Sequence, residues 1–311
     1  MPHMATSKSR SSVRIGVDVG SSLTKLAFRG GSGAVRYELL GRSAYDQVVE
    51  TVKRLQPQVL GLTGGGAAQL ASRLDGRAVQ VNEFTAWGTG ANHLLSRRQK
   101  TDTYLLVSLG TGTSVMLVDH QEVRRLGGTA LGGGTILGLG AALLQESNFA
   151  DTCALAAQGS RDSVDLLVRD IYSDPDRPLK GDLTAASFGR MGRQDTSPPP
   201  REDLAAAIMR LVGENVTLIA GGHARHLGLD RLVFGGSTLR NNPALEAVLT
   251  EVSALLGLKA YFLTNGEFAG ALGALGAVDV QVSPSKKMTQ EHPDAKGQRL
   301  LAASPEAEVQ A

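Results

Sequence analysis

Apolar runs alternate with glycine-rich turns and amphipathic stretches along most of the chain. Near the beginning, Val13–Asp18 and Leu23–Phe28 flank the turn Gly20–Ser22, which predicts a strand, a tight turn and a second strand. Apolar residues at helical spacing predict an amphipathic helix over residues 44–55. The same reasoning predicts strands at Val59–Thr63, Ala78–Val81 and Leu232–Phe234, and helices at Ala67–Leu74, 162–172, 203–219 and from Asn242-Pro243 onward. Strands that alternate with helices indicate a layered α/β fold.

The opening pattern occurs a second time. Tyr104–Leu109 and Val115–Asp119 are apolar, and Gly110–Ser114 is the turn between them. Such a repeat suggests two similar halves that face each other, although two ordinary hairpins would look the same locally. We favour the repeat because both turns combine glycine with hydroxyl residues.

The repeat and the composition predict where the domains begin and end. We expect a first half over residues 13–103 and a second half over residues 104–279. Residues 1–12 are polar and are expected to be a disordered tail or a cloning remnant. From Val280 the chain is polar and aperiodic, so residues 280–311 are expected to be a disordered C-terminal tail.

Composition narrows the class of protein. The 311 residues include 32 lysines and arginines against 30 acidic residues, so nucleic acid and anionic membranes are poor candidate partners. Cys153 is the single cysteine, which excludes an intramolecular disulfide. No uninterrupted apolar stretch reaches the roughly 18 to 20 residues of a membrane span. The polar N-terminus has no apolar signal segment, and the cytoplasm is the simplest expected compartment.

Several glycine-rich loops are candidates for phosphate binding. Asp18–Lys25 and Gly110–Ser114 offer backbone N–H groups and hydroxyl donors. Gly132–Gly134 opens a predicted helix, whose unpaired N–H groups would attract phosphate, but tight chain packing would also explain these glycines. Gly235–Ser237 could contact the base or ribose, or be a plain turn between strand and helix. The Asp18–Lys25 loop also fits an ordinary solvated hairpin turn.

Asp18 stands at the end of the first predicted strand. A carboxylate there could hold Mg²⁺ directly or through water, because magnesium in kinases takes one or two carboxylates plus phosphate oxygens. Lys25 could add positive charge to the same loop or point to solvent. The chain has no G-x-x-x-x-G-K-[ST] pattern, which excludes a P-loop enzyme.

Two further residues are candidates for catalysis and substrate binding. Glu83 follows a predicted strand and could be a base that faces a cleft, or an ordinary acid at a helix N-terminus. Arg124-Arg125 could pair with a substrate carboxylate, or be two exposed charges on a hairpin. His223 and His226 do not suggest zinc, since no other ligands stand near them. Trp87 is expected in the core or an interface.

Seven motifs in this order resemble the type II pantothenate kinase family, over residues 13–278. The motifs are Gly16–Gly20, Asn82–Phe84, Gly110–Ser114, Arg124–Gly128, Gly132–Gly134, Gly181–Ala185 and Asn265–Phe268. The resemblance implies a duplicated actin-like (ribonuclease H-like) kinase fold with ATP in the cleft between the halves. It also implies a homodimer that uses helices of the second half.

The resemblance assigns roles residue by residue. It implies that Glu83 is the catalytic base and that Arg125 and Ser114 bind pantothenate. Phe149 stands where the family often has an aromatic hydroxyl, so packing of its ring would replace a polar contact. The implied ATP contacts are Asp18, Gly20, Ser21, Ser22, Leu23, Thr24, Lys25, Thr111, Gly133, Gly134, Thr135, Ile136, Leu137, Phe149 and Ser237.

The expected function is ATP- and Mg²⁺-dependent phosphorylation of pantothenate, the first step of coenzyme A biosynthesis. A kinase for pantetheine or another small alcohol is the alternative within enzymes. A non-catalytic binder of nucleotide or acyl-CoA is the alternative from another class, and the presence of Asp18, Glu83 and Arg125 argues against it.

Overall fold

The two predicted halves each contain one five-stranded sheet. The computed structural model describes residues 13–31, 33–42, 44–74, 78–96, 99, 101–172, 180–193 and 198–282. In the first sheet the strands lie in the order β3-β2-β1-β4-β5. Its strands are β1 (Val13–Val19), β2 (Thr24–Gly30), β3 (Arg36–Leu40), β4 (Val59–Thr63) and β5 (Val79–Gln80).

The second sheet repeats the topology of the first. Its strands lie in the order β8-β7-β6-β11-β12. Strand by strand, this order corresponds to β3-β2-β1-β4-β5 in the first sheet. In both sheets the first three strands in the chain pair antiparallel, and the other two strands pair parallel. Its strands are β6 (Thr103–Leu109), β7 (Thr113–Asp119), β8 (Glu122–Thr129), β11 (Arg231–Gly235) and β12 (Lys259–Phe262). The repeat predicted from the two apolar-turn-apolar patterns is therefore present in the fold.

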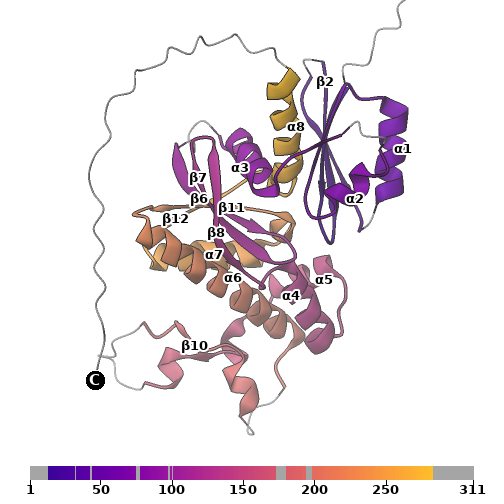
Figure 1. Cartoon of the computed structure of the whole chain (residues 1–311). Helices are drawn as coiled ribbons and strands as arrows, with labels where there is room; N and C mark the ends of the chain where they lie inside the picture. Colours follow the sequence, from indigo (N-terminus) through magenta and orange to yellow (C-terminus); the bar gives the residue numbers. More distant parts are fainter. Residues whose placement is uncertain are drawn as a thin grey trace, which may run out of the picture.

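Helices cover the sheets in layers. Helices α1 (Tyr45–Leu55) and α2 (Ala67–Ala71) lie on the outer side of the first sheet, and α3 (Glu83–Leu94) and α8 (Ala269–Val282) lie between the sheets (Figure 1). Helices α6 (Arg201–His226) and α7 (Pro243–Leu255) pack on the second sheet. Helix α4 (Gly133–Leu139), the π-helix η1 (Gly140–Leu144) that continues it, and α5 (Phe149–Ala156) pack against α6. Each half thereby buries its own apolar cluster.

Helix α8 crosses back from the second half to the first. A side chain at Gly16 of β1 would stand 2.0 Å from the Ala271 carbonyl oxygen, and one at Gly273 would stand 1.7 Å from that of Ala86. Glycine is needed at both positions because α8 lies directly against β1 and α3. The predicted second half, residues 104–279, includes the start of α8, which packs against β1 and β4 of the first sheet. The helix also runs through Val282, past the predicted tail boundary at 280; residues 283–311 and 1–12 lie outside the described residues.

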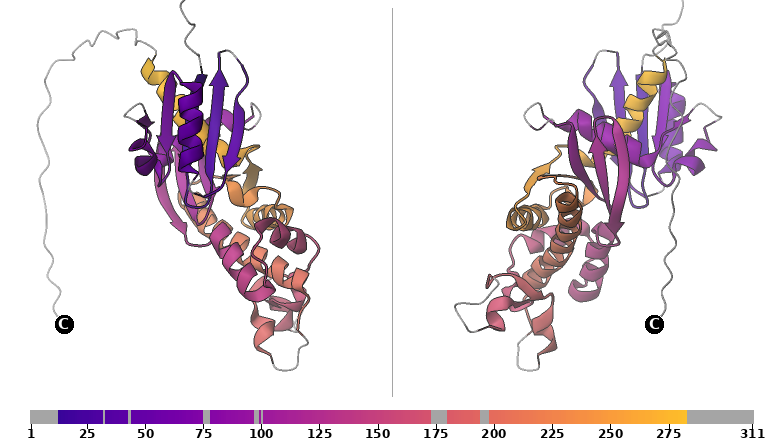
Figure 2. Two further views of the ribbon diagram at one scale, coloured as in Figure 1. Left: turned by 90° about the vertical axis from the view of Figure 1, so that its right-hand side faces the viewer. Right: turned by 60° about the vertical axis from the view of Figure 1, so that its left-hand side comes forward.

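The predicted helix over residues 162–172 is wrong. The chain there forms the short turns η2 (Arg161–Ser163) and η3 (Val168–Asp170) and pairs β9 (Leu166–Leu167) with β10 (Thr184–Ala186). One cause is local, since Asp170 Oδ2 accepts from Leu167 N at 2.8 Å, and one is tertiary, since Asp165 Oδ1 accepts from the distant Phe188 N at 2.8 Å. Such side-chain bonds to the backbone compete with helix formation. This hairpin, followed by η4 (Gly189–Gly192), lies at the end of the molecule away from the first sheet (Figure 2).

Helix α6 has the length and apolar composition of a membrane span. However, 67% of its most apolar stretch is buried inside the fold, as expected of a core helix. Its buried face includes Ile208, Val212 and Val216, which pack in the apolar cluster of the second half. Most of the apolar stripe predicted over residues 203–219 therefore faces the core, whereas Ile219 at its end is exposed.

Gly236 should be the most sensitive of the left-handed glycines. It follows β11 with φ of 119°, and a side chain there would stand 2.1 Å from the carbonyl oxygen of Leu109. Gly228 also has positive φ, at 67°, but has open space around it. We expect Gly228→Ala to cost about 1 kcal/mol of unfolding free energy, and Gly236→Ala to cost clearly more because the backbone must move. Urea unfolding of both variants measures this, and equal losses would contradict the packing argument.

Candidate active-site cleft

The repeat brings the two hydroxyl-rich turns into contact. Gly20–Leu23 follows β1, and Gly110–Gly112 follows β6, at equivalent ends of the two sheets. The Oγ atoms of Ser21 and Ser22 lie 2.8 Å and 2.9 Å from Thr111 Oγ1, within hydrogen-bonding distance. Two segments that are far apart in sequence thus form the facing walls of one cleft.

A cavity of about 310 Å³ opens between these turns. It brings together most of the residues for which sequence predicts phosphate, metal or substrate contacts. Those that line it are Asp18, Gly20, Ser21, Ser22, Leu23, Lys25, Glu83, Thr111, Ser114 and Ser237. Because the sequence predicted these residues from separate motifs, their convergence on one cavity supports a common site.

Asp18 is buried at the floor of this cavity, with 3% of its surface exposed. Burial raises the pKa of its carboxyl, while the charge of Lys25, whose Nζ lies 3.4 Å from Asp18 Oδ2, lowers it. Gly64 and Gly270 make room for the carboxylate, since a side chain at either would come within 2.8 Å of its oxygens. A buried carboxylate with one cationic partner in a polar cavity fits a site for a hydrated cation or phosphate.

Glu83 is the first residue of α3 and also faces the cavity. Asn82 caps the helix, because its Oδ1 accepts from Phe84 N at 3.0 Å and Thr85 N at 3.2 Å. Partial burial raises the pKa of the Glu83 carboxyl, the nearby Asp18 raises it further, and Lys25 lowers it. Glu83 is therefore both an acid at a helix N-terminus and a residue that faces the cleft.

The two adjacent arginines lie on opposite faces of β8. Arg125 pairs with Met116 and Arg124 with Leu117. Met116 packs in the apolar cluster that contains Trp87 of α3. Leu117 packs against the apolar cluster that contains residues of α6, on the other face of the sheet. The Arg125 guanidinium lies 5.9 Å from the centre of the Phe84 ring, next to Glu83.

Arg125 also lies at the margin of the cavity. A side chain at Gly128 would stand 3.0 Å from Arg125 Nη2, and Gly128 pairs with Ser114, which lines the cavity. Arg125 itself is exposed. It is therefore placed to meet a group that extends from the cavity toward β8.

A neighbouring cavity of about 380 Å³ continues the cleft. It shares Ser22, Leu23, Gly110, Thr111 and Ser237 with the first, so the two form one groove. Its other walls are more apolar and include Leu137 and Phe149, together with Gly133 and Gly134, Leu39, Asn148, Ala150, Thr238, Arg240 and Asn241. An apolar pocket with a few polar groups beside a polar one fits the nucleoside and phosphate ends of ATP.

The expectation that the Gly132–Gly134 helix start offers free N–H groups to phosphate needs correction. Gly133 N donates to Gly110 O at 2.8 Å, and Gly134 N donates to Thr111 O at 2.9 Å. A side chain at Gly132 would stand 2.7 Å from Thr111 O. These glycines hold the Gly110–Gly112 turn against α4, so the alternative of tight chain packing explains them.

Three predicted ATP contacts have side chains outside both cavities. Thr24 is buried, with 2% exposed, and Ile136 is fully buried in the core. Thr135 Oγ1 donates to Ala130 O at 3.1 Å and accepts from Gly132 N at 3.3 Å, so it caps α4. These side chains are therefore not proposed as ATP contacts.

Sequence reasoning missed several residues that line the cleft. Trp87, which the sequence predicts in the core or an interface, is buried and also lines the first cavity one helical turn after Glu83. The four-residue spacing from Glu83 could have indicated this, because it places Trp87 on the same face of the predicted helix. Leu39 of β3 and Arg240, the residue after η5 (Ser237–Leu239), line the second cavity, but the sequence patterns did not predict β3 or η5.

Solved structures with bound nucleotide analogues share this fold. The activator of the 2-hydroxyisocaproyl-CoA dehydratase from Clostridium difficile, with bound ADPNP, covers 89% of this chain and 100% of its own, with a TM-score of 0.61 at 14% identity. A ROK family glucokinase from Streptomyces griseus, in complex with glucose and AMPPNP, covers 85% and 98%, with a TM-score of 0.56 at 12% identity. At these identities the likeness shows the fold alone, and it confirms the duplicated actin-like arrangement.

Sequence relatives are much more similar. The Fumble family profile matches residues 31–277. The chain is 37% identical to the type II pantothenate kinase of Oceanobacillus iheyensis over 266 residues, which cover 84% of this chain and 98% of that protein. It is 36% identical over 265 residues to the type II pantothenate kinase of Staphylococcus haemolyticus, covering 85% and 99%. On this evidence, combined with the fold and the cleft, the chain belongs to the type II pantothenate kinase (Fumble) family.

Proposed function

We propose that this protein transfers the γ-phosphoryl group of ATP to the primary hydroxyl of pantothenate, the first step of coenzyme A biosynthesis. The observation that carries the proposal is the convergence of Asp18, Lys25, Glu83 and Ser114 on one cavity that continues into an apolar pocket. Family membership supports pantothenate as the acceptor. Measuring ADP release with and without pantothenate tests the proposal: a kinase requires the acceptor, whereas a non-catalytic binder releases no ADP.

The chemistry follows from the side chains in the cavity. The substrate hydroxyl oxygen attacks the γ-phosphorus, the bond to the β-phosphate oxygen breaks, and Glu83 accepts the hydroxyl proton. Lys25 and the hydroxyl groups of Ser21, Ser22 and Thr111 stabilise the negative charge on the phosphoryl oxygens. We propose that Arg125 binds the pantothenate carboxylate and that Ser114 contacts the same substrate.

Mg²⁺ is proposed as the ion that accompanies ATP. Asp18 is the carboxylate that would hold it, directly or through water, and the ion would neutralise charge on the phosphates. Among the residues that the structure describes, no group of three or more acidic, histidine or cysteine side chains could hold a metal. This donor set fits an ion that takes most of its ligands from phosphate and water.

The assembly and compartment are also proposals. Leu218 and Ile219 on α6 are exposed, at 47% and 36% of their surface, although most of that helix is buried. Exposed apolar side chains on a core helix support a homodimer in which α6 of each copy takes part. The use of ATP as donor supports a cytoplasmic enzyme.

The pKa of Glu83 distinguishes a base in a cleft from an ordinary helix acid. A helix N-terminus alone would lower it below the ordinary value of 4.5, whereas partial burial and Asp18 raise it here. We expect Glu83 to titrate above 4.5, and kcat/KM to fall as the pH drops through that raised pKa. In Asp18→Asn the pKa should be lower, because the repelling charge is gone. Carbon-13 NMR titration, with the signal assigned by its absence in Glu83→Gln, measures both; a wild-type value at or below 4.5 would contradict the account.

A further inference from the structure

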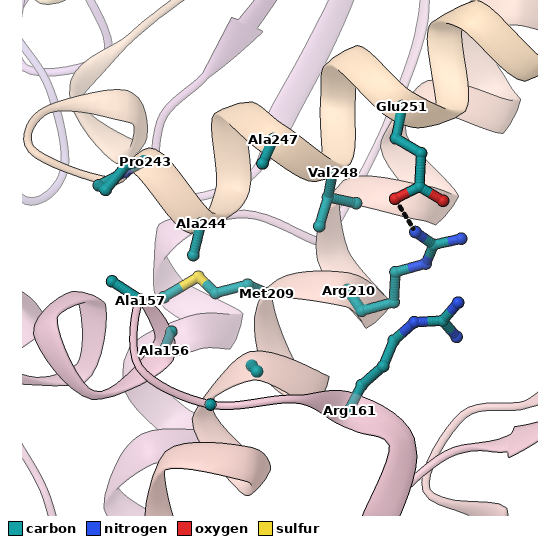
Figure 3. Close-up of a pocket in the computed structure, with 12 residues that line it drawn as sticks. Ala156, Ala157, Arg161, Met209, Arg210, Pro243, Ala244, Ala247, Val248 and Glu251 are labelled. Carbon is teal, nitrogen blue, oxygen red and sulfur yellow. Dashed lines mark hydrogen bonds and ion pairs between the residues drawn. The ribbon is translucent and has the colours of Figure 1, made fainter. Parts of the chain in front are cut away.

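Ser108 brings a free hydroxyl group to the cleft. It is half-buried and lines the cavity that contains Asp18 and Glu83. Its hydroxyl makes no hydrogen bond to any residue that the structure describes. Arg210 and Glu251 show the contrast: they line a cavity between α6 and α7, where Arg210 Nη1 donates to Glu251 Oε2 at 2.9 Å (Figure 3). The Ser108 hydroxyl is therefore available to a molecule in the cleft.

The internal repeat gives Ser108 the place that Asp18 has in the first half. Each is the next-to-last residue of the central strand of its sheet, β6 and β1 respectively, and a glycine-hydroxyl turn follows each strand. Asp18 pairs with Lys25 on β2, and Ser108 pairs with Ser114 on β7. Because β1 and β2 correspond to β6 and β7, Ser108 is the counterpart of Asp18, and Ser114 is the counterpart of Lys25.

The side chains of Ser108 and Asp18 both point to the layer of helices between the sheets. Leu106, two residues before Ser108 on β6, packs in the apolar cluster that contains Trp87 of α3. Since side chains alternate along a strand, Ser108 faces α3 as well. Asp18 faces α8, because a side chain at Gly270 would stand 2.8 Å from its Oδ2. The two counterparts therefore approach one cavity from opposite sheets.

The charges of the cavity favour a hydroxyl at position 108 over a second carboxylate. Among the described residues that line it, the charged ones are Asp18, Glu83 and Lys25, which sum to one negative charge when all are ionised. Another carboxylate would add repulsion where the phosphates of ATP are proposed to lie. A serine adds no charge, and its O–H can donate to a phosphoryl oxygen.

The position of Ser108 along the cleft selects one phosphate. Ser108 lines the polar cavity with Asp18, Lys25 and Glu83, but it does not line the more apolar nucleoside end. We propose that the Ser108 hydroxyl donates a hydrogen bond to an oxygen of the γ-phosphoryl group, from the side opposite Asp18 and Lys25. This inference rests on the proposed function, in which ATP is the phosphoryl donor. Ser108 should then distinguish a nucleoside triphosphate from a diphosphate.

The test compares two nucleotides that differ in the γ-phosphoryl group. AMPPNP has this group and ADP lacks it, and the Kd of each for the full chain is measured by calorimetry in the presence of Mg²⁺. Ser108→Ala removes the hydroxyl. Ser253→Ala is the matched control, because Ser253 lies on α7, lines neither cavity of the cleft, and donates from Oγ to Leu249 O at 2.6 Å.

We expect Ser108→Ala to weaken AMPPNP binding about tenfold, the loss of a hydrogen bond to a charged group, and to change the Kd of ADP less than about twofold. Its kcat should fall, with the KM for pantothenate unchanged, and Ser253→Ala should behave as wild type. Equal weakening of AMPPNP and ADP would mean a structural role and would overturn the inference. So would unchanged AMPPNP binding, with or without a raised KM for pantothenate.

The binding measurements also separate this inference from the proposed function. They need no acceptor, so a failure of pantothenate as the substrate would appear in the reaction products and leave the AMPPNP and ADP comparison intact. If wild type bound neither nucleotide, ATP would not be the donor, and the proposed function and the inference would both be overturned.

Discussion

Glu83→Gln should bind ATP normally and lose about 10²- to 10⁴-fold in kcat, the usual contribution of a single general base. Glutamine has nearly the same shape as glutamate but cannot accept the hydroxyl proton. The position of Glu83 supports a specific effect on turnover: it lines the cavity with Asp18 and Lys25, while Asn82 caps the helix independently of it. Steady-state kinetics with pantothenate, and ATP binding by calorimetry, measure the two quantities separately.

A matched control separates proton transfer from helix stabilisation. Glu202 also lies in the first turn of a helix, α6, but does not line the cleft. Glu202→Gln loses the same favourable interaction with the helix dipole, about 0.3 to 1 kcal/mol of stability, and should keep its turnover. If Glu83→Gln turned over within about threefold of wild type, the 10²-fold minimum for a base would not be met and the assignment would fail.

Arg125→Ala should penalise pantothenate far more than pantetheine. Pantothenate carries a carboxylate, whereas pantetheine ends in a neutral thiol arm. A charge-assisted hydrogen bond to arginine contributes about 1.5 to 3 kcal/mol. Its loss corresponds to a roughly ten- to hundred-fold fall in kcat/KM for pantothenate. A substrate that never used the charge should lose much less.

Arg124→Ala is the matched control on the neighbouring residue. Arg124 pairs with Leu117 on the opposite face of β8 from Arg125, and it is exposed. It should therefore change kcat/KM little for either substrate. Equal losses for pantothenate and pantetheine with Arg125→Ala would mean that this arginine serves phosphate binding or structure. Substrate selection would then need another residue.

The repeated fold was predictable because its signals are local. The runs Val13–Asp18 and Tyr104–Leu109, each followed by a glycine-hydroxyl turn, formed equivalent strands of two sheets with the same topology. The Asn242-Pro243 helix start was also correct, since the Asn242 side chain accepts from Leu245 N. The position of α8 could not be predicted from the sequence patterns. Its apolar residues face both the first sheet and α3, so they do not recur with an amphipathic period.

The candidate site was predictable only in part. Residues that carry distinctive chemistry, such as Asp18 and Glu83, could be selected from sequence, and the structure places both on one cavity. Whether a neighbouring residue points into the cleft depends on tertiary packing. Thr24 and Ile136 stand within predicted loops or helix starts, yet their side chains are buried. Arg240 belongs to no recognisable motif, and it lines the nucleotide pocket only because the turn after β11 places it there.

The most direct test of the central claim is the identity of the phosphorylated product. The purified full chain would be incubated with ATP and Mg²⁺ and with pantothenate, pantetheine or a panel of other small alcohols, and the products would be identified by mass spectrometry and phosphorus-31 NMR. The account predicts 4′-phosphopantothenate, formed with one ADP per product and with the highest kcat/KM for pantothenate in the panel. No phosphorylation of pantothenate, or a clearly higher kcat/KM for another alcohol, would contradict it.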